Sequence, residues 1–349
     1  MHARLAEPKP SDPVLVPPLG GNRAIAERLR AMAVRGRPGV LGVVVETGGS
    51  TYRKPGALIL LDADGTRIGA LSGGCLEAEL ETRARAVLMT GIAADAHFDT
   101  SGDEDRVFGS GTGCGGSTRL LLLPLPAVAS PLRDALIEAD THGLTATLAL
   151  ATGTDNLGAG EACVGKERYR FDRDGSPLDG AAELDAPIEL TIRPCARLLL
   201  LGAGPETRPL LRLTRLLGWQ VELAEHRERW ARFADGSGID CLHDDGQDAL
   251  PALLKRVRFD AALVMNHNYH LDARCLSHLA ASGIGYVGLL GPAARRDDLL
   301  AEIGADVAAS LRPRLHAPVG LPLGGEGAEA IALAIAAQLQ GEFSRDARA

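Results

Sequence analysis

The feature that most constrains the fold of this chain is an apolar strand that ends in a glycine turn and leads into a helix. Residues 196–201 are mostly apolar, Gly202-Ala203-Gly204 follows at once, and 206–217 has the composition of a helix. Short apolar strands and helices then alternate. The strands are expected over 220–224, 259–265 and 286–289, and the helices over 272–281, 293–303 and 328–340. This alternation is typical of a doubly wound parallel sheet, so the C-terminal half is predicted to be Rossmann-like.

The N-terminal half has a different pattern, in which hairpin signals stand beside helices. Asp64-Gly65 separates two apolar segments, which favours a tight β-hairpin. Helices are expected over 22–35, 75–89 and 132–139, and strands over 41–45, 57–61, 66–71, 119–125, 145–151, 167–171 and 187–192. The prediction is an α/β chain with a disordered lead-in over 1–20, a mixed α+β domain over 21–193 and a Rossmann-like domain over 194–349.

Charge and composition exclude several classes of function. The 349 residues include 37 Lys and Arg against 45 Asp and Glu, giving a net charge of −8, and aromatic residues make up 3%. Such a chain lacks the basic surface and the stacking platforms that nucleic acids require. No apolar run approaches the roughly 20 residues that cross a bilayer, and the N-terminus lacks the apolar core of a secretory signal. We expect a cytoplasmic protein that binds neither nucleic acid nor a membrane.

The glycine turn is also a candidate nucleotide site. Gly202 and Gly204 allow the backbone to approach a pyrophosphate, and Glu225, after the next strand, has the spacing of a ribose-binding acid. Two residues disagree with this role. Thr207 replaces the third glycine of the usual pattern, and Glu206 brings an anion to the place that normally receives phosphate. Binding of NAD(P) and a purely architectural turn both stay open.

Two of the six cysteines stand in glycine-rich segments. Cys75 begins a predicted helix, where the helix dipole favours a thiolate. Cys114 lies in a segment with five glycines among residues 109–116, whose N–H groups can form a concave anion site. The glycines next to the two thiols are Gly73, Gly74, Gly113 and Gly115. Both thiols are interpreted as functional; the alternatives are an inert buried cysteine and a simple tight turn.

The segment 47–56 combines hydroxyl groups with two adjacent cations after a buried strand. Ser50, Thr51, Arg53 and Lys54 have the chemistry to hold a phosphate by charge-assisted hydrogen bonds. A solvated loop is the competing interpretation. Weaker signals come from the acidic segment 99–106 and from His267 and His270, a histidine pair without an evident third metal ligand.

Taken together and in chain order, the segments described above resemble those of the XdhC/CoxI family. Its members are the accessory proteins for maturation of xanthine dehydrogenase and related molybdenum hydroxylases. The N-terminal segments that carry the resemblance are 48–56 (GGSTYRKPG), 72–77 (SGGCLE), 99–105 (DTSGDED) and 113–116 (GCGG). The C-terminal ones are 202–204 (GAG), 286–291 (YVGLLG) and 318–321 (PVGL). Together they span roughly residues 20–340 and both predicted domains.

The resemblance implies a maturation factor rather than an enzyme. Such a factor binds the molybdenum cofactor (molybdopterin), protects it while sulfur replaces an oxo ligand, and delivers it to an apo-hydroxylase, with a cysteine desulfurase as a second partner. On this analogy Cys75 and Cys114 lie nearest the molybdenum, and Arg53 and Lys54 suit the cofactor's phosphate. An NAD(P)-dependent oxidoreductase with a reactive cysteine and a pure scaffold are the alternatives. Apolar glycine-rich loops at the domain join are compatible with a homodimer.

Overall fold

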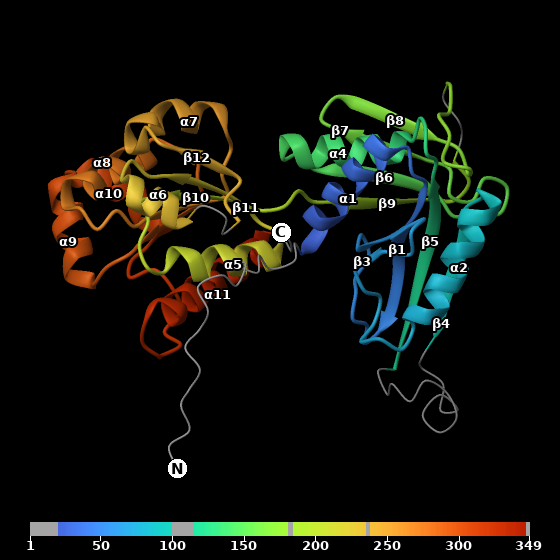
Figure 1. Cartoon of the computed structure of the whole chain (residues 1–349), viewed down its shortest axis with the longest axis horizontal. Coiled ribbons are helices and arrows are strands. Elements are labelled where there is room, and N and C mark those ends of the chain that lie inside the picture. The colour runs from blue at the N-terminus through green and yellow to red at the C-terminus, as the bar shows by residue number, and fades with distance from the viewer. Residues whose placement is uncertain (1–19, 100–114, 181–183, 235–237, 347–349) are drawn as a thin grey trace, which may run out of the picture. The chain divides into compact units, whose positions relative to one another are not determined.

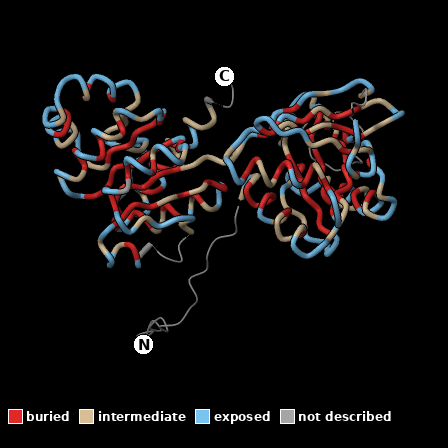
Figure 2. Tube along the Cα trace, turned by 90° about the horizontal axis from the view of Figure 1, so that it is seen from above, coloured by how far each residue is buried: buried red, intermediate tan, exposed pale blue. Residues whose placement is uncertain are grey.

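The computed structural model describes residues 20–99, 115–180, 184–234 and 238–346. Within this part the chain forms two compact units, one over Gly21–Cys195 and one from Ala196 onward (Figure 1). Buried residues follow the strands of each unit, while many exposed residues lie in the outer helices and loops (Figure 2). Apart from Gly20, the expected lead-in over 1–20 lies outside the described residues.

The N-terminal unit is built on two antiparallel sheets. A five-stranded sheet has the order β3-β2-β1-β5-β4, and a four-stranded sheet has the order β8-β7-β6-β9. The strands of the first sheet are β1 (Gly39–Gly49), β2 (Leu58–Asp62), β3 (Arg67–Ile68), β4 (Ala94–Asp99) and β5 (Gly116–Leu125). Those of the second are β6 (Ala146–Ala151), β7 (Gly160–Val164), β8 (Glu167–Phe171) and β9 (Pro187–Ile192). The described helices are α1 (Gly21–Arg35), α2 (Glu77–Thr90) and α4 (Pro131–His142).

Strand β1 is central to this unit because both of its faces are buried. Leu41 and Val43 face a core shared with α1, α4 and the second sheet. Val40 and Val44 face the opposite way, into a core shared with α2. Since side chains alternate along a strand, the apolar run in β1 supplies two layers at once. The second of these layers fixes α2 against the five-stranded sheet.

The C-terminal unit has one six-stranded parallel sheet, in the order β12-β11-β10-β13-β14-β15. Its strands are β10 (Arg197–Leu201), β11 (Gln220–Ala224), β12 (Cys241–His243), β13 (Ala261–Val264), β14 (Tyr286–Leu289) and β15 (Leu315–His316). Its α-helices are α5 (Thr207–Leu217), α6 (Glu228–Ala234), α7 (Leu250–Arg256), α8 (Tyr269–Ala280), α9 (Ala293–Glu302), α10 (Ala305–Leu311) and α11 (Ala328–Asp346). Two short 3-10 helices are η1 (Gly246–Ala249) and η2 (Arg312–Arg314).

Helices cover both faces of this sheet. Leu198 and Leu200 of β10 pack with residues of α5 and α11, whereas Leu199 and Leu201 pack with residues of α7 and α8 (Figure 1). All four leucines are fully buried, as a central strand of a parallel sheet requires. The strand order reverses between β10 and β13, which is the arrangement of a Rossmann sheet. The predicted fold class is therefore confirmed.

Several predicted boundaries were wrong, each for a local reason. Helix α2 begins at Glu77 and not at Cys75, because hydrogen bonds hold the preceding residues in a separate loop. Helix α8 begins at Tyr269, since the Asn268 side chain accepts a hydrogen bond from the Leu271 N–H and caps it. The second hairpin strand, expected over 66–71, is only the short β3. Strands β4, β7 and β12 were missed because short strands with polar residues give a weak apolar signal.

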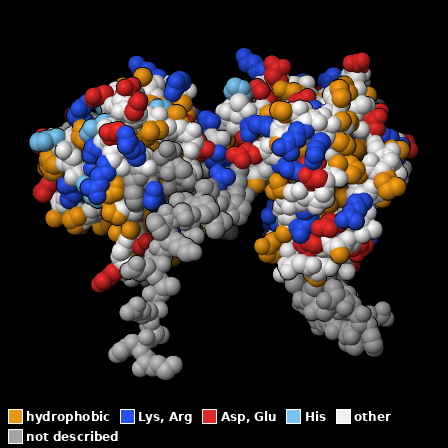
Figure 3. Space-filling view, viewed as in Figure 1, with side chains coloured by type: hydrophobic (Ala, Val, Ile, Leu, Met, Phe, Trp, Pro, Cys, Tyr) orange, Lys and Arg blue, Asp and Glu red, His pale blue; other side chains and the backbone are white. Residues whose placement is uncertain are grey.

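None of the helices in the described part combines the length and the apolar character that a membrane crossing needs. On the face seen in Figure 3, basic and acidic side chains are interspersed over each unit.

Candidate functional site

The segment 71–77, here named the cysteine loop, holds Cys75 in front of helix α2. The Ser72 hydroxyl donates to Glu77 Oε2 at 2.6 Å and accepts from the Leu76 N–H at 3.2 Å. Glu77 Oε1 accepts from the N–H groups of Leu71 and Ser72 at 3.1 and 2.9 Å. These bonds close the loop on itself, so its shape does not depend on the thiol.

The Cys75 thiol is exposed on this loop. Its Sγ lies 3.3 Å from the Ser72 hydroxyl, and a Cβ added to Gly73 or Gly74 would meet no described atom within 4 Å. Gly74 has a φ of 121°, a conformation that L side chains rarely adopt. The two glycines therefore add no side chain beside the sulfur, and the role of this thiol in a ligand site stays a prediction.

Burial shapes the electrostatics of this loop through Glu77. Burial alone would raise the pKa of the Glu77 carboxyl, but hydrogen bonds from Ser72 and Leu71 outweigh it and hold that pKa below its usual value. The carboxylate is consequently ionised at neutral pH and holds the loop through charge-assisted hydrogen bonds.

The cysteine loop faces the same end of the five-stranded sheet as two other predicted segments. Gly49 of β1 pairs with Gly116 of β5, and Asp99 of β4 pairs with Ser117, so these residues share one end. The C-terminal turn of α2 lines a groove with Gly39 and Leu125 at the opposite end. Helix α2 therefore begins toward the Gly49–Gly116 end (Figure 1).

The loop after β1 brings Ser50 against the glycines before β5. A Cβ on Gly116 would lie 2.2 Å from the Ser50 carbonyl oxygen, so only glycine fits there. Gly115 has a φ of 60°, and a Cβ there would meet no described atom within 4 Å. Ser50 and Gly115 thus border one open backbone surface. Gly113, Cys114 and most of the acidic segment lie outside the described residues.

The two cations of this loop differ in their environment. Lys54 is exposed, and its Nζ donates to the Thr51 hydroxyl at 3.3 Å. Arg53 is half-buried, and no described group accepts from its buried Nε. A guanidinium with a buried, unsatisfied N–H is a ready donor to an anionic group. Arg53 and Lys54 keep the phosphate-binding role as a prediction.

In the glycine turn of the C-terminal unit, two backbone N–H groups already donate to side chains of the same unit. The Ala203 N–H donates to Glu225 Oε2 at 2.8 Å, and the Gly204 N–H donates to the Thr207 hydroxyl at 2.9 Å. A Cβ on Gly202 would lie 2.5 Å from the Cα of Asn266, so this glycine is required by the close approach of the segment after β13. The turn offers neither of these N–H groups to a phosphate without rearrangement.

Glu225 is fully buried and already bonded. Besides Ala203, its carboxylate accepts from the N–H of Arg227 at 2.8 Å and from the Arg227 guanidinium at 2.6 Å. Burial opposes ionisation, yet the hydrogen bonds and charge of Arg227 leave the pKa of Glu225 lowered. Its assignment to a ribose stays a prediction, and this arrangement speaks against it.

Glu206 and His267 lie over the same turn. Glu206 Oε1 is 3.5 Å from His267 Nε2, and the Glu206 side chain is only 4% exposed. His267 has a φ of 56°, a conformation that is uncommon outside glycine and is found at functional sites. His270, its proposed partner, is exposed in α8, and the described residues place neither histidine in a group of three metal ligands.

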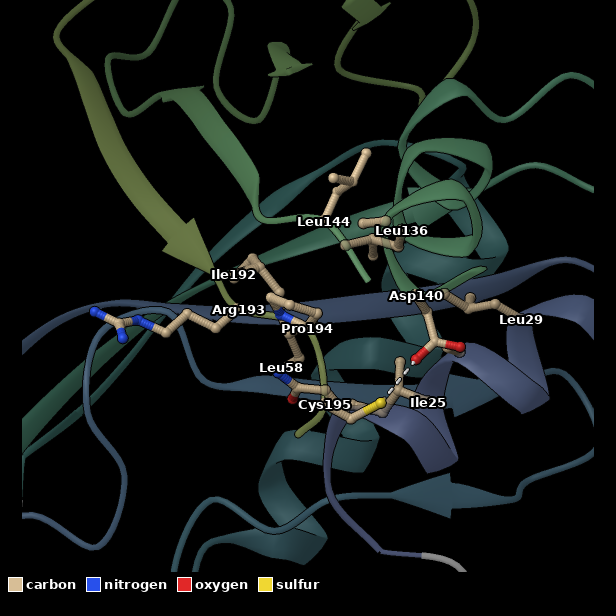
Figure 4. Close-up of a pocket in the computed structure, with 13 residues that line it drawn as sticks. Ile25, Leu29, Leu58, Leu136, Asp140, Leu144, Ile192, Arg193, Pro194 and Cys195 are labelled. Carbon is tan, nitrogen blue, oxygen red and sulfur yellow. Dashed lines mark hydrogen bonds between the residues drawn. The ribbon is translucent and has the colours of Figure 1, made fainter. Parts of the chain in front are cut away.

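Cys195 and Cys275 are less suited to a ligand site than Cys75. Cys195 points toward Asp140, 3.6 Å away, in a cavity between α1, α4 and the end of β9 (Figure 4). This cavity holds about 20 Å³, room for roughly one water molecule. Burial raises the pKa of the Cys275 thiol to about 12. Neither environment accommodates a cofactor.

Two family models match the chain. The model described as the XdhC and CoxI family matches residues 32–99, and the model described as the XdhC Rossmann domain matches residues 198–339. These ranges contain the cysteine loop and the glycine turn, respectively. The chain belongs to the XdhC and CoxI family.

Two relatives of this XdhC-family chain carry names that mention xanthine dehydrogenase. A protein of Bacillus subtilis (strain 168), named as a probable xanthine dehydrogenase subunit, is 27% identical over 314 residues, covering 86% of this chain and 92% of the relative. A crystal structure described as a xanthine dehydrogenase from Bacillus halodurans has 28% sequence identity and a TM-score of 0.73. The structural match covers 92% of this chain and 96% of the chain in the crystal structure. The XdhC-family likeness therefore includes both units.

One cluster in this XdhC-family chain was missed by sequence reasoning. Glu222, Cys241 and His243 place metal-ligating atoms close together at the edge of the parallel sheet. The available signal was a Cys-x-His spacing, which puts both side chains on one face of a strand. That signal needs the register of the neighbouring strand before it indicates a site.

Proposed function

We propose that this XdhC-family chain serves the maturation of a xanthine dehydrogenase-type molybdenum hydroxylase by carrying the molybdenum cofactor as its cargo. The cofactor would lie at the Gly49–Gly116 end of the five-stranded sheet and pass from there to the apo-enzyme. The names of the relatives support the class of enzyme that would receive the cofactor, here called the client. The exposed Cys75 thiol, directly after Gly73 and Gly74, is the observation that carries the proposal.

The chemistry of the donors fits such a cargo. A thiolate is a soft ligand that suits an anionic metal dithiolene, and Cys75 offers one after two glycines that carry no side chain. Arg53, with its buried unsatisfied N–H, and Lys54 would hold the phosphate end of the cofactor. Gly73, Gly74 and Gly115 would allow close backbone approach, and Ser50, which lies beside Gly116, would contribute its hydroxyl. Cys114 would supply a second thiol in this proposal.

The chain's own part is to bind, shield and release. Replacement of an oxo ligand by sulfur would be carried out by a cysteine desulfurase while the cofactor is held. A dinucleotide role for the C-terminal unit is less well supported, because Glu225 and Thr207 already accept from the N–H groups of the glycine turn.

The test is anaerobic incubation of the purified full chain with molybdenum cofactor, followed by gel filtration. We expect pterin fluorescence and molybdenum to co-elute with the wild-type protein, and Cys75→Ser to lower retention by about tenfold or more. Cys163→Ser is the matched control, since Cys163 lies in the same unit on β7 and is half-buried beside Glu161. Arg53→Ala should weaken retention, whereas Arg83→Ala should not, since Arg83 lies on α2 and pairs with Glu79 of the same helix.

Loss of function should be visible in the client as well. Apo-xanthine dehydrogenase incubated with the loaded chain should regain activity, and the Cys75→Ser protein should restore less. Absence of co-elution, or equal retention by wild type and Cys75→Ser, would remove the proposal.

A further inference from the structure

The edge of the parallel sheet brings together three side chains of different ligand types. Strands β11 and β12 are parallel, and Glu222 is in register with Cys241 while Ala224 is in register with His243. Residues two apart on a strand share a face, and paired residues on neighbouring strands share it too. Glu222, Cys241 and His243 therefore project from one face of the sheet.

Their ligand atoms are close. His243 Nε2 lies 2.8 Å from Glu222 Oε2, and one ligand atom from each of the three residues lies within 4.8 Å of the others. Tetrahedral coordination with metal–ligand bonds of about 2.0–2.3 Å separates ligand atoms by roughly 3.5 Å. Small side-chain rotations would bring the three atoms to that separation.

The surroundings enclose the cluster while leaving it reachable. The Glu222 and His243 side chains are only 15% and 11% exposed. Ala224, the neighbour of Glu222 on this face, packs in the core that contains Leu250 and Leu253 of α7. Cys241 is exposed, because β12 is the edge strand of the sheet. A cation from solvent can therefore reach two mostly buried ligands past the thiol.

A simple pairing of histidine with carboxylate explains only part of this arrangement. It accounts for Glu222 and His243 but gives no role to a thiol held in register beside them. The proposed cargo site does not involve the cluster either, since that site is built from residues of the N-terminal unit.

We propose that Glu222, Cys241 and His243 bind one divalent cation of the zinc class, with solvent as the fourth ligand. A mixed set of sulfur, nitrogen and oxygen donors suits Zn²⁺ or Co²⁺, whereas Mg²⁺ and Ca²⁺ prefer all-oxygen sites. The cation replaces the thiol proton, which is released to solvent.

Such a cation would tie the edge strand to its neighbour. Strand β12 has only three residues and pairs with β11 on one side alone, so few backbone hydrogen bonds hold it. Because a ligand that binds the folded state alone stabilises it, added Zn²⁺ should raise the thermal midpoint of the C-terminal unit.

The test is an anaerobic titration of the metal-free full chain with Co²⁺, read by the thiolate-to-cobalt charge-transfer absorption in the near ultraviolet. We expect a saturable band that Zn²⁺ abolishes by displacement. Cys241→Ser should eliminate the band, and His243→Ala and Glu222→Gln should each weaken Co²⁺ binding by about tenfold or more. Cys75→Ser and Cys163→Ser, in the other unit, should leave both band and affinity unchanged.

The exposed position of Cys241 makes Cys241→Ser the deciding variant, because that substitution leaves the core intact. A wild-type chain without the band, or a band that persists in Cys241→Ser, would overturn the proposal. Retention of molybdenum cofactor by Cys241→Ser should equal that of wild type, which separates failure of this inference from failure of the proposed function.

Discussion

At the scale of single residues, Ser72 and Glu77 give the cysteine loop its shape. Glu77 is 7% exposed, and its carboxylate accepts two backbone N–H groups and the Ser72 hydroxyl. The hydroxyl in turn accepts from the N–H groups of Gly74 and Leu76. The thiol of Cys75 is thus positioned by its neighbours and does not itself hold the loop together.

Replacing Glu77 by Ala should destabilise the N-terminal unit by about 1–3 kcal/mol, because buried N–H groups would lose their acceptor. Denaturant unfolding followed by far-ultraviolet circular dichroism measures this change. Glu79→Ala on the same helix is the control. Its side chain is about half exposed and pairs with Arg83 on the same helix, so the loss should stay below about 1 kcal/mol. Equal effects of the two substitutions would contradict the assigned role of Glu77.

His267 should make stability depend on pH. The Glu206 carboxylate raises the pKa of His267 above its usual value, against the opposing effect of partial burial. Stability from this pair is then fully present below the unfolded pKa of about 6.5 and is lost as pH rises through the raised folded pKa. The difference in free energy of unfolding between wild type and His267→Asn should therefore decrease as pH rises from about 6.5 through the folded pKa. It should stay below about 1 kcal/mol, because half of the ring is exposed.

Asn is a suitable replacement because it tolerates the positive φ at this position. Tryptophan fluorescence during urea unfolding at several pH values reports on the correct unit, since Trp219 and Trp230 both lie in it. His270→Asn, at an exposed position three residues on, is the control for the substitution itself. A pH-independent difference between wild type and His267→Asn would refute the coupling.

At the scale of elements, helix α2 is held by packing. The residue before it, Leu76, provides no side-chain cap, so the helix depends on its buried face. Leu80, Ala84 and Val87 form that face and contact the core beneath the five-stranded sheet. The same helix determines where the cysteine loop lies, which links its packing to the proposed site.

Leu80→Ala should cost about 2–5 kcal/mol, the range for truncation of a fully buried leucine. It should also reduce retention of molybdenum cofactor, because the helix that positions Cys75 would be loosened. Met89→Ala is the matched control on the same helix, as Met89 is 87% exposed and should tolerate the change. Thermal unfolding and the gel-filtration assay give the two readouts; comparable losses from both variants would contradict the packing role.

At the scale of the whole molecule, the two units have separate cores. The clusters around β1 belong to the N-terminal unit and those around β10 to the C-terminal unit. A substitution that damages one core is therefore expected to act locally.

Gly202→Ala tests this locality. Gly202 has a φ of 91° and no room for a Cβ beside Asn266, so the substitution should destabilise the C-terminal unit by about 2 kcal/mol or more. Hydrogen exchange should accelerate in β10 and stay unchanged in β1. Gly283→Ala, where a Cβ meets no described atom within 4 Å, should have little effect. Equal acceleration in both units would show that they unfold together.

Much of the fold could be predicted from the sequence because its signals are local. The apolar strand 198–201, the glycine turn and the alternation of strands and helices all involve consecutive residues, and the structure confirms the Rossmann-like unit. The same holds for Cys75, whose open surroundings come from the two glycines directly before it.

Only the tertiary structure decided which polar side chains already have hydrogen-bond partners and which side chains lie together on neighbouring strands. Glu225 has the spacing of a ribose ligand, but its carboxylate already accepts hydrogen bonds from the Ala203 N–H and the Arg227 guanidinium. The Cys-x-His spacing of Cys241 and His243 did not indicate a site until strand register placed Glu222 beside them. Sequence patterns record the chemistry of neighbours along the chain, whereas hydrogen-bond partners and strand register are set by folding between distant segments.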